Sequence, residues 1–171
     1  MGCSDKPEVE SIAVLAEMSD HLKVKVVRAI DLAFKDPNLT SDPFVLLTLG
    51  RDSHKSKTTV KNDDLTPIWN EVFTFSVNNT DSSLLKVELW DNDRLRRDDK
   101  LGDTEIDLKP LFEKQGKDRK VLCPCKENCL YNDSSIIQYA DGRKIQHVWL
   151  KLRNVDSGLL NLHFEWLPHS R

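Results

Sequence analysis

Apolar and polar residues alternate with a period of two in short runs along most of this chain. Such alternation places every second side chain on the same face of a β-strand, so that one face is buried and the other solvated. Turns rich in Asp, Asn, Gly and Pro separate most of the runs. The pattern predicts an all-β fold, an eight-stranded antiparallel β-sandwich with two sheets packed over one core. The predicted strands lie at residues 22–26, 44–49, 54–60, 69–77, 85–89, 106–108, 145–152 and 159–167.

The stretch from residue 109 to residue 140 interrupts this rhythm. Residues 110–114 are compatible with one helical turn, and about 113–140 is expected to be a long irregular insertion before the penultimate strand. Loops of this length in a compact domain tend to carry recognition, so we expect the insertion to help bind a protein partner. A chain of 171 residues suits one full domain. We expect a single domain over residues 20–168, preceded by a flexible N-terminal extension over residues 1–19.

The N-terminal residues bear on the compartment. No apolar run approaches the ~20 residues that span a bilayer, and residues 1–10 show no pattern of a secretory signal. We therefore expect a cytosolic protein, or one on the membranes that face the cytosol. Gly2 and Cys3 resemble the start of dually acylated proteins, but Lys6 stands where the myristoylation motif has Ser or Thr. An ordinary tail is therefore favoured over lipidation.

Three of the four cysteines, Cys123, Cys125 and Cys129, fall in one short segment. Their spacing is not a familiar zinc arrangement, although His147 offers a fourth ligand. Free thiols on a loop are the interpretation that a cytosolic chain favours.

Two loops, residues 35–44 and 90–102, concentrate aspartate next to apolar strands, and both can project from the same end of a sandwich. The candidate metal ligands in them are Asp36, Asp42, Asp91, Asp93 and Asp99. At ~5 Å and an effective dielectric near 20, each pair of carboxylates repels by roughly 3 kcal/mol. Ca²⁺ relieves this repulsion, because it takes six to eight oxygen ligands and tolerates irregular loops, whereas Mg²⁺ demands a stricter octahedron.

Two alternatives compete with this calcium site. Asp-rich turns often only cap strands, but two such loops, each bounded by an apolar strand, favour a shared ion site. The 12-residue EF-hand loop is absent, since no Gly and terminal Glu occur at its spacing. Asp91 and Asp93 are alternate residues whose side chains share one side of an extended segment, as the bridging of two adjacent ions requires.

The two loops and the turn between them closely resemble the C2 domain signature over roughly residues 20–167. The runs that carry it are Thr40-Ser41-Asp42-Pro43-Phe44, Thr66-Pro67-Ile68-Trp69-Asn70-Glu71 and Asp91-x-Asp93…Asp99-x-Leu101-Gly102. The resemblance implies a Ca²⁺-dependent membrane-docking sandwich in which the five aspartates are ligands to two or three ions.

Residues 103–110, 128–130, 152–158 and 165–166 resemble more narrowly the plant C2-domain abscisic acid-related family. Members are small single-domain proteins that carry abscisic acid receptors to the plasma membrane, and some are described as GTPase activators. The resemblance implies two kinds of partner, an anionic phospholipid membrane and a protein, either an abscisic acid receptor or a GTPase. The chain departs from that family in its longer N-terminus and its cysteine-rich residues 122–129. A weaker resemblance, in residues 158–167, is to extended synaptotagmins, whose tandem C2 domains tether membranes.

The charge distribution suggests how an ion would switch membrane binding. The formal charge is −3, and the six aspartates of the two loops (36, 42, 91, 93, 98 and 99) account for all of the excess, because the remainder would carry +3. Two Ca²⁺ would raise the total to +1 and remove the patch that repels anionic lipid. Apolar loop tips can enter the interface while arginines meet headgroups. Lysines separated by even numbers of residues along one strand share a face, which is either a lipid contact or a merely solvated surface. The lipid-binding candidates are Lys55, Lys57, Lys61, Arg94, Leu95, Arg96, Arg97 and Leu39.

The sequence argues against two other classes of protein. The net charge is slightly negative and no basic stripe is interleaved with aromatic residues, so nucleic acid is not an expected partner. A nucleophile elbow, a phosphate-binding loop and an HExxH motif are all missing, so we expect no enzyme.

The predicted function is a calcium-dependent phospholipid-binding module that recruits a protein partner. We expect it in the cytoplasm and peripherally at the plasma membrane, and the nucleus is left open. The alternative is a regulator, a GTPase activator, in which Arg94 or Arg96 acts in trans on phosphoryl transfer.

Overall fold

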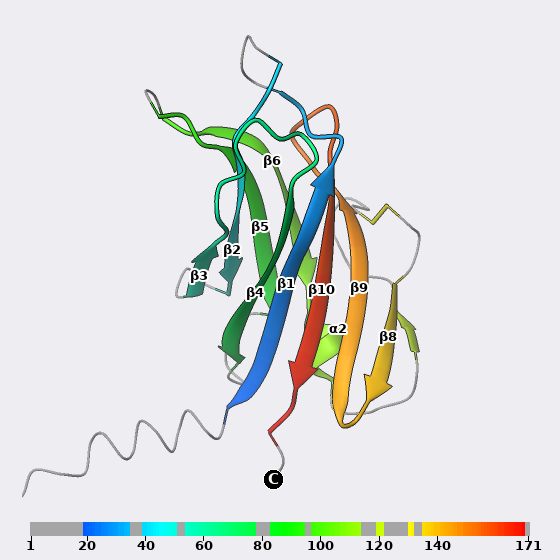
Figure 1. The fold of residues 1–171 in the computed structure, drawn as a ribbon. Coiled ribbons are helices and arrows are strands. Elements are labelled where there is room, and N and C mark those ends of the chain that lie inside the picture. Colours follow the sequence, from blue (N-terminus) through cyan, green and yellow to red (C-terminus); the bar gives the residue numbers. More distant parts are fainter. Residues whose placement is uncertain are drawn as a thin grey trace, which may run out of the picture.

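The computed structural model describes residues 19–34, 39–50, 54–77, 83–94, 97–113, 119–121, 130–131 and 135–169. In this part of the chain the strands form two antiparallel sheets (Figure 1). The larger sheet has the order β4-β1-β10-β9-β8-β7 and the smaller sheet the order β3-β2-β5-β6. The strands are β1 (Asp20–Ile30), β2 (Pro43–Leu49), β3 (His54–Lys57), β4 (Ile68–Val77), β5 (Leu84–Asp91), β6 (Asp99–Asp107), β7 (Arg119–Val121), β8 (Ser135–Ala140), β9 (Arg143–Lys151) and β10 (Leu159–Leu167).

The period-two alternation builds the core as predicted. In β10, Leu160, Leu162, Phe164 and Trp166 are buried between the sheets while the residues between them face outward. In β5, Leu85, Val87 and Leu89 do the same from the other sheet. Removing apolar surface from water, at about 25 cal/mol per Å², is the main favourable term that holds such layers together. The predicted all-β sandwich is confirmed.

The strand count was wrong, because the predicted irregular insertion contains two strands. β7 and β8 extend the six-stranded sheet beyond β9. β8 enters the sheet through the turn Asp141-Gly142, whose φ angles of 50° and 75° are those of a type I′ hairpin turn. Ile137 is the buried apolar residue of β8, so alternation alone gave too weak a signal. The helical turn expected at residues 110–114 is present as α2 (Lys109–Phe112), which buries Leu111.

Several predicted strand boundaries also need correction, and those of β3 and β6 have a structural cause. β3 ends at Lys57, three residues earlier than predicted. The Val45 backbone N–H donates to Thr58 Oγ1 (2.9 Å), so a hydroxyl takes the place of a ladder carbonyl and the strand stops there. β6 begins at Asp99, well before the predicted residue 106. A bulge inserts Leu101 as an extra residue, with Gly102 opposite Leu89 and Lys100 opposite Trp90.

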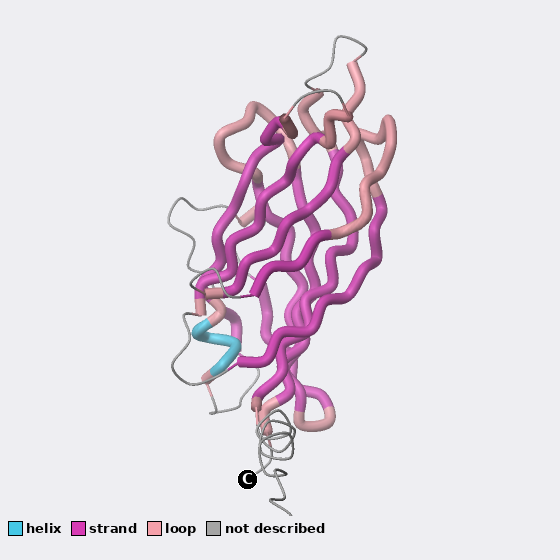
Figure 2. Tube along the Cα trace, turned by 90° about the vertical axis from the view of Figure 1, so that its left-hand side faces the viewer, coloured by secondary structure: helices cyan, strands magenta, loops and turns pink. Residues whose placement is uncertain are grey.

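The strands run along the long axis of the molecule. The described connections β1–β2, β3–β4 and β5–β6 lie at the end opposite the C-terminus, and the β8–β9 turn lies at the other end (Figure 2). At the C-terminal end, the His169 backbone N–H donates to Asp20 Oδ1 (2.7 Å), which ties the last described residue to the start of β1. Among the described residues, no helix has the length and apolar character needed to cross a membrane.

Candidate functional site

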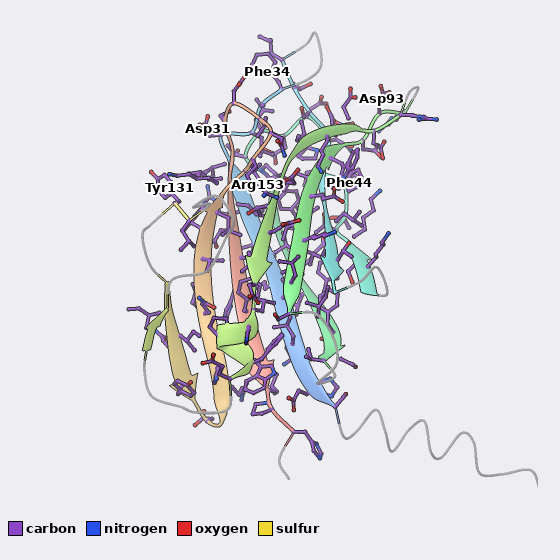
Figure 3. The ribbon with its side chains drawn as sticks, turned by 180° about the vertical axis from the view of Figure 1, so that it is seen from behind. Asp31, Phe34, Phe44, Asp93, Tyr131 and Arg153 are labelled. Carbon is purple, nitrogen blue, oxygen red and sulfur yellow. The ribbon has the colours of Figure 1, made fainter. Side chains whose placement is uncertain are left out.

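The connections β1–β2, β3–β4 and β5–β6 meet at the loop end of the sandwich. Asp31 and Phe34 follow β1, and Asp93 follows β5; Figure 3 shows all three at this end of the molecule. The sandwich topology therefore brings together the two aspartate-rich loops, as the sequence predicted. It also adds a third loop from between β3 and β4.

Asp91 lies at the centre of this end. It is the last residue of β5, opposite Pro43 of β2 on one side and Asp99 of β6 on the other. Its side chain is 5% exposed, and its Oδ1 accepts the backbone N–H of Asp42 at 2.6 Å. Strand register thus places three of the predicted carboxylates, from β5, β6 and the residue before β2, side by side.

The fourth described ligand candidate, Asp93, lies two residues beyond β5. Its backbone N–H donates to Asp98 Oδ1 (3.2 Å), and the Asn92 N–H donates to the Asp42 carbonyl oxygen (3.0 Å). The first bond lies within the β5–β6 connection, and the second holds that connection against the residue before β2. The fifth candidate, Asp36, lies outside the described residues.

The β3–β4 connection contributes acidic residues that the sequence analysis did not include. The Asp63 backbone N–H donates to Asp42 Oδ1 (2.8 Å), and the Asp64 N–H donates to the Ser41 carbonyl oxygen (3.0 Å). Asp63 has a φ of 52°, a conformation that Asp tolerates better than most residues. The adjacent pair Asp63-Asp64 in a predicted turn was visible in the sequence. That this turn lies beside Asp42 depends on the order of the strands, which the sequence alone did not reveal.

The donor set agrees in kind with calcium, since carboxylate and carbonyl oxygens are the ligands of a hard cation. In the described residues, however, no group of three or more His, Cys, Asp or Glu side chains is arranged to hold a metal ion. Asp42 Oδ1 and Asp91 Oδ1 both accept backbone N–H groups instead.

Apolar and basic side chains border this end. Leu39, in the β1–β2 connection, is 59% exposed and has a φ of 61°. Phe34, 51% exposed in the same connection, was missed, although an aromatic residue beside Lys35 and Asp36 was a visible signal. Arg94 and Arg97 are exposed. Leu95 and Arg96 lie outside the described residues.

The predicted lysine stripe is present in part. Lys55 and Lys57 are exposed and lie two residues apart on β3, an edge strand of the four-stranded sheet. Lys57 Nζ lies 3.6 Å from the ring centroid of Phe44, a cation–π contact. Lys61 lies beyond the end of β3, where its backbone N–H donates to the Pro43 carbonyl oxygen (3.0 Å). The expectation that all three lysines share one strand was therefore wrong for Lys61.

A cluster of ion pairs fastens β6 to the β9–β10 connection. Asp103 Oδ1 accepts from Arg153 Nη2 (2.8 Å), Asp103 Oδ2 pairs with Lys100 Nζ (2.9 Å), and Lys100 also pairs with Glu88 (2.7 Å). Burial would raise the pKa of Asp103, but hydrogen bonds from Lys100 and Asn154 and the nearby positive charges together lower it. Backbone bonds in both directions between Asp103 and Arg153 complete this connection between the two sheets.

Comparison with known proteins agrees with this architecture. The C2 domain family model matches residues 20–123. Protein C2-DOMAIN ABA-RELATED 8 of Arabidopsis thaliana is 37% identical over 155 residues, which cover 85% of this chain and 91% of that protein. The chain belongs to the C2-domain ABA-related family. The ADP-ribosylation factor GTPase-activating protein AGD12 of the same plant is 36% identical to this C2 domain over 175 residues, or 96% of the chain, but only 50% of its own length is covered.

Solved C2 domains have the same fold. A C2 domain of plant extended synaptotagmin 1 superposes with a TM-score of 0.61 and 28% identity, covering 90% of this chain and 98% of that one. The calcium-bound pair of C2 domains from extended synaptotagmin 2 matches with a TM-score of 0.61 and 25% identity, covering 86% of this chain and 45% of that one. These similarities support a membrane-binding C2 module.

Proposed function

We propose that this C2 domain binds anionic phospholipid membranes in a Ca²⁺-dependent manner and holds a protein partner there. The observation that carries the proposal is the convergence of Asp42, Asp91, Asp93 and Asp99 on the loop end of the sandwich. A calcium-bound structure among the similar C2 domains supports the same assignment.

In this proposal Asp36, Asp42, Asp91, Asp93 and Asp99 hold the calcium ions. Bound calcium would supply positive charge and open coordination positions that lipid phosphates can fill. Without it, the buried Asp91 carboxylate and its acidic neighbours present negative charge toward an anionic surface, which repels them.

The exposed groups around this end complete the membrane contact. Leu39 and Phe34 offer apolar surface for the interfacial region, while Arg94 and Arg97 can meet headgroup phosphates. In the same proposal, Arg96 also meets headgroup phosphates and Leu95 also enters the interfacial region. Lys55, Lys57 and Lys61 form a second basic surface, on the side of the four-stranded sheet, each worth about 1 kcal/mol near an anionic membrane.

The decisive experiment is sedimentation with phosphatidylserine vesicles in the presence of Ca²⁺ or a chelator. We expect the wild-type protein to sediment only with Ca²⁺, and the double variant Asp91→Asn with Asp93→Asn to stay in the supernatant. Asp141→Asn is the matched control, because it removes one exposed carboxylate in the β8–β9 turn and Asn suits that turn equally well. Calcium-dependent sedimentation of the double variant at wild-type levels would refute the assignment.

The proposed protein partner is an abscisic acid receptor, with the insertion as its binding surface. The family relationship supports this partner, since the similar Arabidopsis proteins are named as ABA-related. Tyr131 and Ile136, both in the insertion, are 54% and 53% exposed and offer apolar surface for a contact. Plasma-membrane and cytoplasmic locations follow from these two binding activities.

Point variants test the partner surface, because deleting the insertion would also remove β7 and β8 from the sheet. Tyr131→Ser with Ile136→Ser should preserve Ca²⁺-dependent vesicle binding and weaken capture of an abscisic acid receptor in a pull-down. Ile68→Ser, which removes an equally exposed side chain from β4, should leave capture unchanged. Undiminished capture by the double variant would place recognition elsewhere.

Activation of a small GTPase is the second candidate. A relative named as a GTPase-activating protein favours it, although half of that protein lies outside the region shared with this chain. GTP hydrolysis by an ADP-ribosylation factor, measured with and without this protein, decides the matter. Suppose that the domain accelerates hydrolysis and that Arg94→Ala abolishes the effect. The protein is then assigned as a GTPase activator and not as a membrane-binding module without enzymatic activity.

A further inference from the structure

A groove of about 360 Å³ lies on the outer face of the six-stranded sheet, away from the loop end. It crosses three neighbouring strands, β4, β1 and β10, which face the reader in Figure 1. Its lining side chains are Lys23, Lys25, Val72, Thr74, His163 and Glu165. None of these residues belongs to the proposed calcium or lipid contacts.

One cross-strand row gives this groove its character. Lys25 of β1 lies opposite Val72 of β4 on one side and His163 of β10 on the other. His163 in turn lies opposite His147 of β9, and the two imidazole rings stack with their centroids 3.9 Å apart and their planes 19° apart. The row therefore presents three basic side chains in succession, without an acidic residue between them.

The next row contains the one acidic residue of the lining. Glu165 lies opposite Lys23, and its Oε1 accepts from Arg143 Nη1 at 2.8 Å and lies 3.8 Å from Lys23 Nζ. The Glu165 charge is thus shared by two cations, and in the described part of the chain Lys25 forms no ion pair. With both histidines neutral, these four charged groups sum to +2.

His163 can respond to an occupant of the groove. Its Nε2 atom is buried and has no hydrogen-bond partner among the described residues. Burial lowers the pKa of His163, and the neighbouring His147 and Lys25 lower it further, against an opposing effect of Glu165. The imidazole is therefore neutral at pH 7, and a bound anion would reverse the balance by favouring its protonated form.

We propose that the groove is an anion-binding site for a phosphate group, held between Lys25 and His163, on which His147 stacks, with the Thr74 hydroxyl at its edge. A phosphate has several acceptor oxygens and up to two negative charges, so it can accept from the lysines on β1 and from the His163 imidazole on β10 at once. A carboxylate, with two oxygens and one charge, would match fewer of these donors.

Inorganic phosphate and sulfate are the probes, used with a chelator and without Ca²⁺, so that the calcium loops play no part. Side-chain NMR titration should shift the His163 and His147 resonances in a saturable manner. Lys25→Gln should weaken phosphate binding about fivefold, as expected for the loss of one partly exposed charged contact. Lys151→Gln is the matched control, since Lys151 is an exposed lysine at the end of β9 and does not line the groove.

The pH dependence separates this site from a general basic surface. Sulfate keeps its charge between pH 8 and pH 6, so any change of affinity there comes from the protein. Because a bound anion favours the protonated form of His163, sulfate affinity should rise as the pH falls, by at most about tenfold per pH unit. His163→Gln should flatten this dependence, and His163→Arg should restore tight binding at pH 8.

Vesicles containing phosphatidylinositol 4-phosphate, again without Ca²⁺, identify the source of the phosphate. Weaker vesicle binding by Lys25→Gln than by Lys151→Gln assigns the groove to a lipid headgroup, and equal vesicle binding assigns it to a soluble phosphorylated ligand. The proposal is overturned if phosphate and sulfate leave both histidine resonances unmoved, or if Lys25→Gln binds them as the wild type does. Neither result would affect the calcium proposal, which rests on the other end of the molecule.

Discussion

Asp91→Asn should make this C2 domain more stable without calcium and less stable with it. Asp91 is buried and lies opposite Asp99 in the ladder, next to Asp42. The substitution removes the charge but keeps Oδ1, so the hydrogen bond from the Asp42 backbone N–H is preserved. We therefore expect the substitution to act mainly through electrostatics and calcium binding.

The expected size of both effects follows from the geometry. Two like charges about 5 Å apart at an effective dielectric near 20 repel by roughly 3 kcal/mol. Asp99 is exposed, so solvent screening reduces this to about 1 kcal/mol, near the upper range for cross-strand like charges. For a chain of this length that is a rise in Tm of about 2–4 °C. Calcium at 100 times its dissociation constant should stabilise the wild type by about 2.7 kcal/mol, and the variant by much less.

Thermal unfolding followed by circular dichroism, with a chelator and then with excess Ca²⁺, measures both effects in one experiment. The two unfolding curves should exchange order between the conditions, while Asp141→Asn follows the wild type in both. The reasoning is refuted if Asp91→Asn is less stable than the wild type in the chelator, or if calcium stabilises both proteins equally.

Three further outcomes are expected. Replacing Lys55, Lys57 and Lys61 by glutamine should weaken binding to polyphosphoinositide vesicles more than binding to phosphatidylserine vesicles. Equal losses on both lipids would show that these lysines form a general electrostatic face. Gly102→Ala should cost at least about 2 kcal/mol more in urea unfolding than Gly142→Ala, because both have positive φ but only the first places a Cβ 2.9 Å from Val155 Cγ1. Asp103→Asn should destabilise the protein at pH 7 and have little effect near pH 2. The pKa of Asp103 is lowered in the folded state, so its contribution is present above the usual pKa of about 4 and is lost as the pH falls through the folded value.

The layered fold could be predicted because its signal is local. Leu160, Leu162, Phe164 and Trp166 alternate within one strand, and the buried face of β10 follows directly from that spacing. β8 was missed because its signal lies elsewhere. Ile137 is its buried apolar residue, and the strand is specified by the turn Asp141-Gly142 and by pairing with β9.

The part of the candidate site that could be predicted is the part formed by side chains that stand in a recognisable sequence pattern. The run Asp91-x-Asp93 was visible in the sequence, and Asp42 was grouped with it because two aspartate-rich loops can project from the same end of a sandwich. Asp63 joins them through a backbone N–H, a donor that every residue except proline carries and that no residue pattern reveals. The stacking of His147 on His163 depends on the register of β9 against β10, and residues 16 positions apart give no local sign of it.

The pairing of β1 with β10 has a consequence for how such a domain can be joined to other polypeptide. The first and last strands are antiparallel neighbours in the middle of one sheet, and Asp20 meets His169 at the end opposite the aspartate loops. Any polypeptide fused before β1 or after β10 therefore leaves from the end that points away from those loops. A fluorescent protein or a second domain can be attached at either position without screening the aspartate loops, and two such attachments would begin close enough together to act as a pair of distance reporters.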